Sequence, residues 1–368
     1  MINFFRWKFS KRFIPYGKQS INNEDIKSVK KAMKSALITQ GPLTKEFEEK
    51  IANKVGAEYS VSFNSATSAL HIACKALGLE QGDYLWTSPI TFVASANCGL
   101  YCGAKVDFVD IDPNTGLISI EKLKEKLDFA SKNNTLPKII IPVHLAGSSC
   151  NMKEISKLGA KYNFKIIEDA SHAIGGKYND KYIGNCEYSS ICIFSFHPVK
   201  IITTGEGGMA TTNEFNLFNL MQKLSSHGIV RDQSKFLFEP NGVWSYEQQT
   251  LGYNFRITEI QAALGISQLK RLDYFVKKRN QLHKIYTELF ENEPIRMLEI
   301  PKDSYSALHL AIIRLNDTRK GSHKFIFEEM RKNNIGVQLH YQPVHLQPYY
   351  KKLGFKEGDF PNAEVYGH

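Results

Sequence analysis

Residues 138–169, KIIIPVHLAGSSCNMKEISKLGAKYNFKIIED, decide the fold class. Two apolar runs, KIII and FKIIED, flank a segment whose apolar residues recur at helical spacing. The alternation extends back to YSVSF at 59–63 and forward to FKIIED, after which come shorter β-like runs, YSSICIFSF and GGMATTN, as expected near a sheet edge. Strands that alternate with helices of about ten residues predict an α/β protein, with a parallel or mixed sheet covered on both faces.

The chain is long enough for more than one domain. Its 368 residues correspond to about two domains at roughly 150 residues each. Residues 257–290 have one continuous helical pattern, which we expect to link two domains. The predicted units are a large domain with an N-terminal segment, residues 14–293, and a small C-terminal domain, residues 294–368, of strand, helix and strand or loop.

Composition and charge exclude several classes of protein. Hydrophobic residues make up 42% and charged residues 23%, as in ordinary globular proteins. The net charge of +10 favours anionic ligands, but the lysines are scattered along predicted helices without interleaved aromatics, so we expect no nucleic-acid partner. No transmembrane segment and no signal peptide are predicted. The opening MINFFRWKFSKRF is either a loosely ordered terminus or a contact for an anionic membrane surface.

The six cysteines have no CxxC pair and no histidine at ligand spacing. We therefore expect reduced thiols in a cytoplasmic protein and no metal site.

Ligands of open α/β sheets bind beyond the carboxyl ends of the strands. The segments that follow predicted strands are therefore the candidate binding residues: 64–67, 88–92, 144, 169–172 and 195–200.

Lys200 follows a predicted buried strand in FSFHPVK, and Pro198 interrupts regular pairing before it. Burial lowers the pKa of a lysine, and the neutral amine can form an imine with an aldehyde cofactor. The alternative is that Lys200 is one of many surface lysines.

Asp169 ends the apolar strand FKIIED, and a buried carboxylate needs a cationic or donor partner. A protonated pyridine nitrogen is such a partner, and the pairing lets a cofactor ring accept carbanion electrons. Equally, Asp169 could cap a helix that begins at SHAIGG.

NSATSAL, residues 64–70, lies where a strand turns into a helix, so its backbone N–H groups can hold a phosphate. Ordinary capping by Ser65 or Thr67 is the alternative. Phe92 follows the next strand and can stack on a planar ring, although a core position is the alternative.

Taken together in this order, the motifs resemble the sugar aminotransferases of the DegT/DnrJ/StrS family, which have the PLP-dependent fold type I (aspartate aminotransferase-like). The resemblance covers roughly residues 14–350. It is carried by ITQGP, NSATSAL, SPITFVASAN, IPVHLAG, EDASHAIGG, FSFHPVKIITTGEGG and GYNFRITEIQAALGISQL.

The resemblance implies a role for each matching residue. Lys200 would be the catalytic Schiff-base lysine of pyridoxal 5'-phosphate, and Asp169 the partner of the pyridine nitrogen. The other implied cofactor contacts are Ala66, Thr67, Phe92, His172, Ser195 and Asn254, the last from the second subunit of a homodimer. The candidate contacts to nucleotide or sugar are Tyr16, Thr39, Gln40, Arg256 and His340.

Lys200 also argues against the sugar dehydratases of this family, in which a histidine replaces the lysine. LITQGP, FSFHPVK, TTGEGG, SSHGIVRD and HYQPV look most like enzymes that aminate a UDP-4-keto-6-deoxy-N-acetyl-L-altrosamine-type sugar for pseudaminic acid biosynthesis, with L-glutamate as donor. The alternatives are transaminases for 4-amino-arabinose, bacillosamine or perosamine precursors, and a catalytically silent paralogue.

The chain stops at AEVYGH, whereas relatives continue through a short strand and a final helix. We therefore expect a truncated small domain with apolar surface exposed and substrate closure weakened.

Overall fold

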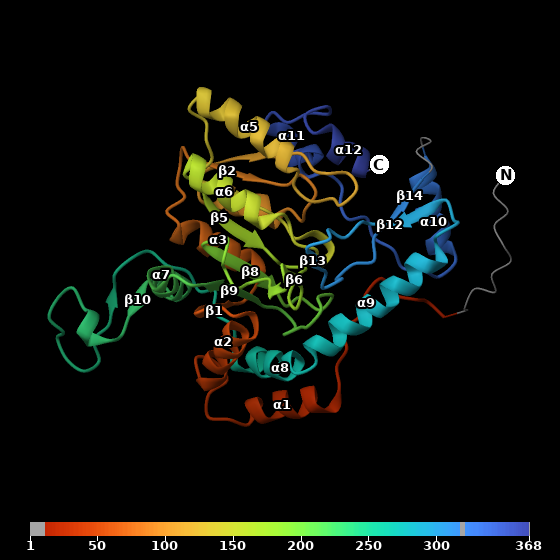
Figure 1. Cartoon of the computed structure of the whole chain (residues 1–368). Helices are drawn as coiled ribbons and strands as arrows, with labels where there is room; N and C mark the ends of the chain where they lie inside the picture. The colour runs from red at the N-terminus through yellow and green to blue at the C-terminus, as the bar shows by residue number, and fades with distance from the viewer. Residues whose placement is uncertain (1–11, 317–320, 368) are drawn as a thin grey trace.

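The computed structural model describes residues 12–316 and 321–367, and the opening segment singled out above lies mostly outside them. At its centre is a seven-stranded sheet in the order β1-β9-β8-β5-β4-β2-β3 (Figure 1). The strands are β1 (Tyr59–Phe63), β2 (Tyr84–Thr87), β3 (Lys105–Phe108), β4 (Ile139–Ile141), β5 (Lys165–Asp169), β8 (Ile191–Ser195) and β9 (Gly208–Thr212). The neighbours of β9 are antiparallel to it and the other pairs are parallel, so the predicted α/β class with a mixed sheet is confirmed.

The expectation that β8 and β9 lie near a sheet edge needs refinement. The edge strands are β1 and β3, and β9 lies between β1 and β8. All five residues of β8 and of β9 are buried. A strand covered on both faces has no polar side, which explains the short, continuously apolar run of β8.

Helices cover the sheet in chain order. They are α2 (Pro42–Val55), α3 (Ala66–Ala76), α4 (Ala94–Tyr101), α5 (Ile120–Lys132), α6 (Met152–Tyr162) and α7 (Phe215–Ser225). Of these, α2 packs against β1, α3 against β8 and β9, and α6 against β5. Strands and helices therefore alternate along the chain as the sequence predicted, and the helices pack on the sheet.

The single long helix expected over residues 257–290 is wrong. Two helices, α8 (Glu259–Leu269) and α9 (Leu272–Leu289), meet at Lys270 and Arg271. The Arg271 guanidinium turns back to Asp25, 2.5 Å away, and so ties this junction to α1 (Asn23–Met33). Periodicity missed the break because the apolar residues continue across it.

The apolar face of α8 is covered within the chain. It packs against α1 and α2, and Ala262, Ala263 and Ile266 are buried there. A second subunit is therefore not needed to cover this apolar helix.

Beyond α9 lie β12 (Ile295–Met297), β14 (Ile313–Leu315) and α10 (Ser322–Lys332). The later elements η3 (Val344–Leu346), α11 (Pro348–Lys352) and α12 (Pro361–Gly367) pack on the core around β3. The amides of Asn362 and Ala363, for example, donate to Asp110 at 3.0 and 2.9 Å. The division into domains at residues 293 and 294 stays a prediction.

One feature was not anticipated. Between β10 (Ile229–Val230) and β11 (Glu247–Gln248), which also flank η2 (Gln233–Lys235), the chain forms an arm that extends away from the sheet (Figure 1). The arm and its base carry exposed apolar side chains: Leu237, Phe238, Val243, Trp244, Tyr246 and Leu251. Three short strands, β6 (Lys177–Tyr178), β7 (Lys181–Tyr182) and β13 (Ser304–Tyr305), form a separate sheet.

All six cysteines are free and buried, the state that a reducing compartment maintains. The cytoplasmic location stays a prediction. Among residues 12–316 and 321–367, no helix is both long and apolar enough to cross a membrane. No group of three or more potential ligand side chains in these ranges is arranged to hold a metal ion.

Candidate active site

Sheet register joins three segments that are far apart in the sequence. Gly208, the first residue of β9, pairs with Phe63 at the end of β1 and with Ser195 at the end of β8. A β-carbon at Gly208 would lie 2.5 Å from the Ser65 carbonyl carbon and 2.6 Å from the Ala66 nitrogen. The turn after β1 therefore packs directly on Gly208, with Ser195 beside it.

That turn leads into α3. The Ser65 side chain caps the helix by accepting a hydrogen bond from the Ser68 amide at 3.1 Å. Ala66 and Thr67 are the first two residues of the helix, and amides in these positions have no intrahelical acceptor. The Ser68 amide serves the cap, whereas the Ala66 and Thr67 amides remain available for an anion. The positive end of α3 can therefore hold a phosphate although the helix is capped.

Gly208→Ala tests this cradle. We expect the added methyl to push the Ser65–Ala66 backbone away and to weaken binding of a phosphate-bearing cofactor by about tenfold or more, since misplaced donors lose their hydrogen bonds. Cofactor titration into the apo-protein measures this. Gly17→Ala is the matched control because its β-carbon would approach no atom closer than 3.8 Å. Equal cofactor affinity in both variants would contradict the cradle.

Asp169 ends β5 and is buried. Its Oδ2 accepts a hydrogen bond from Ser95 Oγ at 2.6 Å, and its Oδ1 accepts from the Ser171 amide at 3.1 Å. A turn, and no α-helix, follows Asp169, so the helix-cap alternative is wrong. The Ser95 amide in turn donates to the Phe92 carbonyl at 3.2 Å, which places Phe92 near this carboxylate with its ring 60% exposed.

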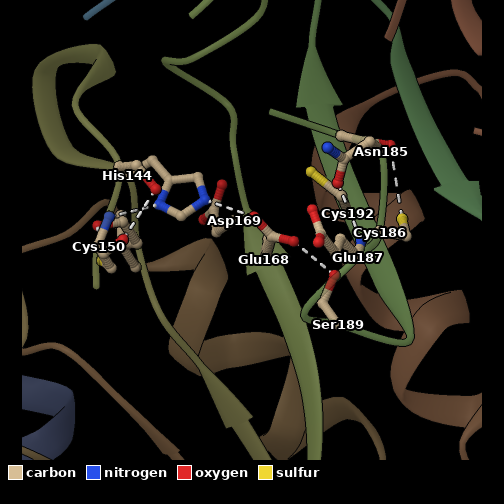
Figure 2. Close-up of polar contacts among 12 residues, drawn as sticks. His144, Cys150, Glu168, Asp169, Asn185, Cys186, Glu187, Ser189 and Cys192 are labelled. Atoms are coloured by element: carbon tan, nitrogen blue, oxygen red, sulfur yellow. Dashed lines mark hydrogen bonds and ion pairs between the residues drawn. The ribbon is translucent and has the colours of Figure 1, made fainter. Parts of the chain in front are cut away.

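Glu168, the residue before Asp169 in β5, forms a buried network of hydrogen bonds with His144 and Ser189 (Figure 2). The Cys150 amide donates to His144 Nδ1 at 3.2 Å, so the proton on Nε2 is the one that His144 donates to Glu168 at 2.7 Å. Ser189 donates to the other oxygen of Glu168. His144, a residue expected at a strand end, thus has a structural role beneath the site.

Lys200 lies five positions after β8, and its amide donates to the His197 carbonyl at 2.9 Å. Burial lowers the pKa of Lys200 to about 8, against the opposing effect of the nearby Asp169 carboxylate. A minor fraction of the amine is therefore neutral at pH 7, and that fraction rises steeply through pH 8.

The charge of Lys200 acts on three imidazoles. Burial, together with the positive charge of Lys200, lowers the pKa of His172 and of His309 well below the usual value. The pKa of His340 falls to about 4, again mainly through burial. The rings of His172 and His309 are in contact, with centroids 4.5 Å apart. Near pH 7 the three rings are neutral.

Two candidate substrate residues meet in this cluster. Tyr16 Oη is hydrogen bonded to His340 Nε2 at 2.8 Å, and the two rings stack with centroids 5.3 Å apart. Burial raises the pKa of Tyr16 to about 12, so its hydroxyl stays protonated. Residues 324 positions apart thus form one wall near Lys200.

The other candidates lie elsewhere. Thr39 pairs with Thr258, and Gln40 and Arg256 line one groove beside α2 and α7. Arg256 donates to Ser226 Oγ at 2.9 Å. Asn254 is exposed, next to Phe255, whose carbonyl accepts from the amide of Asn64.

Sequence reasoning missed several residues around the site. His309 lies in LHLAIIRL, the first predicted strand of the small domain, of which only Ile313–Leu315 forms a strand. Tyr341 follows His340 in HYQPV, and its aromatic character next to a candidate histidine was the only available signal. Glu259 caps α2 by accepting from the Leu43 and Thr44 amides at 2.7 and 3.0 Å, which joins ITQGP to GYNFRITE.

These residues fit pyridoxal phosphate. The start of α3, packed on Gly208, offers donors to a phosphate, and Asp169 offers a buried carboxylate to a pyridinium nitrogen. Lys200 offers an amine that burial keeps reactive. No single segment supplies all three groups, but the sheet brings them together at the carboxyl ends of β1, β5 and β8.

Comparison with known proteins agrees with this chemistry. Residues 19–368 match the DegT/DnrJ/EryC1/StrS aminotransferase family. The chain is 40% identical to the UDP-4-amino-4,6-dideoxy-N-acetyl-beta-L-altrosamine transaminase of Campylobacter jejuni subsp. jejuni serotype O:23/36 over 341 residues, 92% of this chain and 86% of that protein.

Solved structures agree as well. Helicobacter pylori PseC, an aminotransferase of pseudoaminic acid biosynthesis, has a TM-score of 0.88 at 32% identity, covering 97% of this chain and 92% of that one. The PLP form of Spr1654 from Streptococcus pneumoniae has a TM-score of 0.87 at 28% identity, with coverage of 97% and 92%. The fold is that of the PLP-dependent sugar aminotransferases, and pyridoxal phosphate is the cofactor. The chain belongs to the DegT/DnrJ/EryC1/StrS aminotransferase family.

Proposed function

We propose that this sugar aminotransferase moves an amino group from L-glutamate to C4 of a UDP-linked 4-keto-6-deoxy sugar of the N-acetyl-L-altrosamine type. The observation that carries this proposal is the 40% identity, over 92% of the chain, with a transaminase named for the corresponding amino sugar. The structural similarity to PseC supports it. The alternative acceptors are the keto precursors of 4-amino-arabinose, bacillosamine and perosamine.

In this proposal, each cofactor contact uses a group placed above. Ala66, Thr67 and Ser195 would hold the phosphate at the start of α3, and Phe92 would stack on the ring. When bound, pyridoxal phosphate supplies an electron sink for the carbon that loses a proton. Asp169 keeps the proton on the ring nitrogen, and its two hydrogen bonds, from Ser95 and Ser171, fix the carboxylate for that task.

Lys200 is the proposed general base. Its Nζ would take the proton from the reacting carbon of the substrate and hold it for return. A pKa of about 8 suits both directions, because a base works best when its pKa is near the working pH. Because the three imidazoles are neutral, they do not compete with the pyridine nitrogen for the Asp169 carboxylate.

For the substrate, the Tyr16–His340 pair is the proposed wall for the sugar, since the charge of Lys200 acts on His340. Thr39, Gln40 and Arg256 are the proposed nucleotide contacts. Arg256 supplies a cation beside the groove that it lines with Gln40, and a diphosphate would pair with it.

An amino-transfer assay tests the acceptor. Purified holoenzyme is supplied with L-glutamate and a panel of UDP-, dTDP- and GDP-linked 4-keto sugars, and 2-oxoglutarate release is measured. We expect the UDP-linked altrosamine-type ketone to give the highest kcat/KM. A higher value for another sugar would reassign the substrate. A yellow protein that transfers to none of them would favour the silent paralogue.

We further propose that the active unit is a homodimer in which Asn254 contacts the cofactor phosphate of the partner subunit. Asn254 is exposed in a single chain. The arm between β10 and β11 supports a second copy as the partner, because Val243 is 92% and Trp244 77% exposed, more than an isolated chain in water favours for such side chains.

Mixing inactive chains tests the shared site. We expect Lys200→Ala and Asn254→Ala each to be inactive alone and to recover about a quarter of wild-type activity when mixed in equal amounts. Half the dimers are then mixed, and each holds one intact site. No recovery despite demonstrated subunit exchange, or a fully active monomer in sedimentation, would contradict the model.

A further inference from the structure

His172 connects a backbone amide to Tyr341. The Ala146 amide donates to His172 Nδ1 at 3.3 Å, and His172 Nε2 lies 3.3 Å from Tyr341 Oη. An amide can only donate, so Nδ1 must present its lone pair, and the neutral ring carries its proton on Nε2. His172 therefore donates to the Tyr341 oxygen.

Because His172 donates to the Tyr341 oxygen, the hydroxyl proton of Tyr341 is free to be donated to another group. The oxygen of Tyr341 accepts from His172, so its own O–H must point to another acceptor. Within residues 12–316 and 321–367, no group accepts that proton. Burial raises the pKa of Tyr341, helped by nearby Tyr16 and Asp169, so the hydroxyl keeps its proton throughout the working pH range.

The hydroxyl lies in the reaction site. The nearby Asp169 carboxylate contributes to the raised pKa of Tyr341. The charge of Lys200 contributes to the lowered pKa of the preceding residue, His340. Tyr341 is thus a neutral donor near Asp169, with one side of its oxygen occupied by His172. His309 lines the same site, but its Nδ1 has no partner among the described residues, so nothing fixes its direction.

Amino transfer exchanges a carbonyl oxygen for nitrogen, and a donor aimed at that oxygen polarises the carbonyl. We propose that Tyr341 is a catalytic residue whose hydroxyl donates a hydrogen bond to the carbonyl oxygen of the keto substrate, with His172 as its positioning residue. The proposal rests on the amino-transfer reaction above and is independent of which sugar is the acceptor.

Tyr341→Phe removes the hydroxyl and keeps the ring. The enzyme is loaded with pyridoxamine phosphate and mixed with 2-oxoglutarate, and the return of the visible absorbance of lysine-bound cofactor is followed. We expect this step to slow on the order of 10²-fold, as when one oxyanion donor is lost. The resting spectrum, its pH titration and the cofactor affinity should stay as in the wild type. Tyr350→Phe, which removes a core hydroxyl bonded to Asn97, is the matched control and should react normally.

His172 has its own test. Glutamine can accept from the Ala146 amide and donate to Tyr341, whereas alanine can do neither. We therefore expect His172→Gln to recover much of the rate that His172→Ala loses, and neither change to add to the Tyr341→Phe defect. Equal loss in both variants would overturn the positioning role.

Two results would overturn the Tyr341 assignment. One is an unchanged rate in Tyr341→Phe. The other is a shifted pH titration of the cofactor spectrum, which would show that the hydroxyl serves the cofactor. A wild type that ignores 2-oxoglutarate would contradict glutamate as donor, and the comparison is then made with the keto sugar that the panel identifies.

Discussion

Lys200→Ala is expected to abolish the visible absorbance of lysine-bound cofactor and to lower amino transfer by at least about 10³-fold, since one side chain supplies both the attachment point and the general base. Absorbance of the purified protein and 2-oxoglutarate release measure the two effects. Lys165→Ala, at the exposed start of β5, is the matched control and should keep both. A borohydride-reducible adduct that persists in Lys200→Ala would show that another lysine holds the cofactor.

The same amine predicts a pH dependence. Because its pKa is lowered to about 8, Lys200 is mostly protonated at pH 7 and mostly neutral at pH 9. Only the neutral form attacks an aldehyde, so cofactor capture by the wild-type apo-protein should accelerate through pH 8. Stopped-flow absorbance measures the rate, and a midpoint near pH 10 would mean that the amine is not desolvated.

Asp169→Asn should retain cofactor but lose on the order of 10²- to 10³-fold in activity. A neutral amide does not hold the proton on the pyridine nitrogen, so the ring accepts electrons poorly, whereas phosphate contacts and Lys200 remain. Cofactor content and kcat, measured on the same sample, separate these effects. Asp107→Asn, at the partly exposed ion pair with Lys126, is the control and should be active.

The competing role for Asp169 predicts another result. If its carboxylate only closes the turn through the Ser171 amide, asparagine would serve almost as well, since its carbonyl oxygen also accepts a hydrogen bond. Activity near wild type in Asp169→Asn, with cofactor bound, would establish that role and remove Asp169 from the reaction.

Local patterns predicted the sheet and part of the site. The strand–turn–helix at NSATSAL, the strand end at Asp169 and the lysine after ICIFS each follow from a few neighbouring residues. They were therefore visible in the sequence, and β1, α3, β5 and β8 have the expected places. The family resemblance then supplied roles that the local chemistry left open.

What the sequence did not reveal depends on contacts between distant segments. Gly208 is constrained by a turn more than 140 residues earlier in the sequence. The orientation of the Tyr341 hydroxyl is set by His172, which lies 169 residues earlier. The break between α8 and α9 was missed because the apolar residues continue across it, and periodicity cannot detect the Arg271–Asp25 contact at the junction. His309 was missed because it lies in a segment whose pattern is simply apolar.

The pairing of β1 with β9 also has a consequence for synthesis on the ribosome. The edge strand that precedes the phosphate turn pairs only across an interval of about 150 residues, from Tyr59 to Thr212. Contacts of such long sequence separation form late, so the emerging polypeptide cannot retain the vitamin-derived coenzyme until β9 has left the exit tunnel and paired with β1.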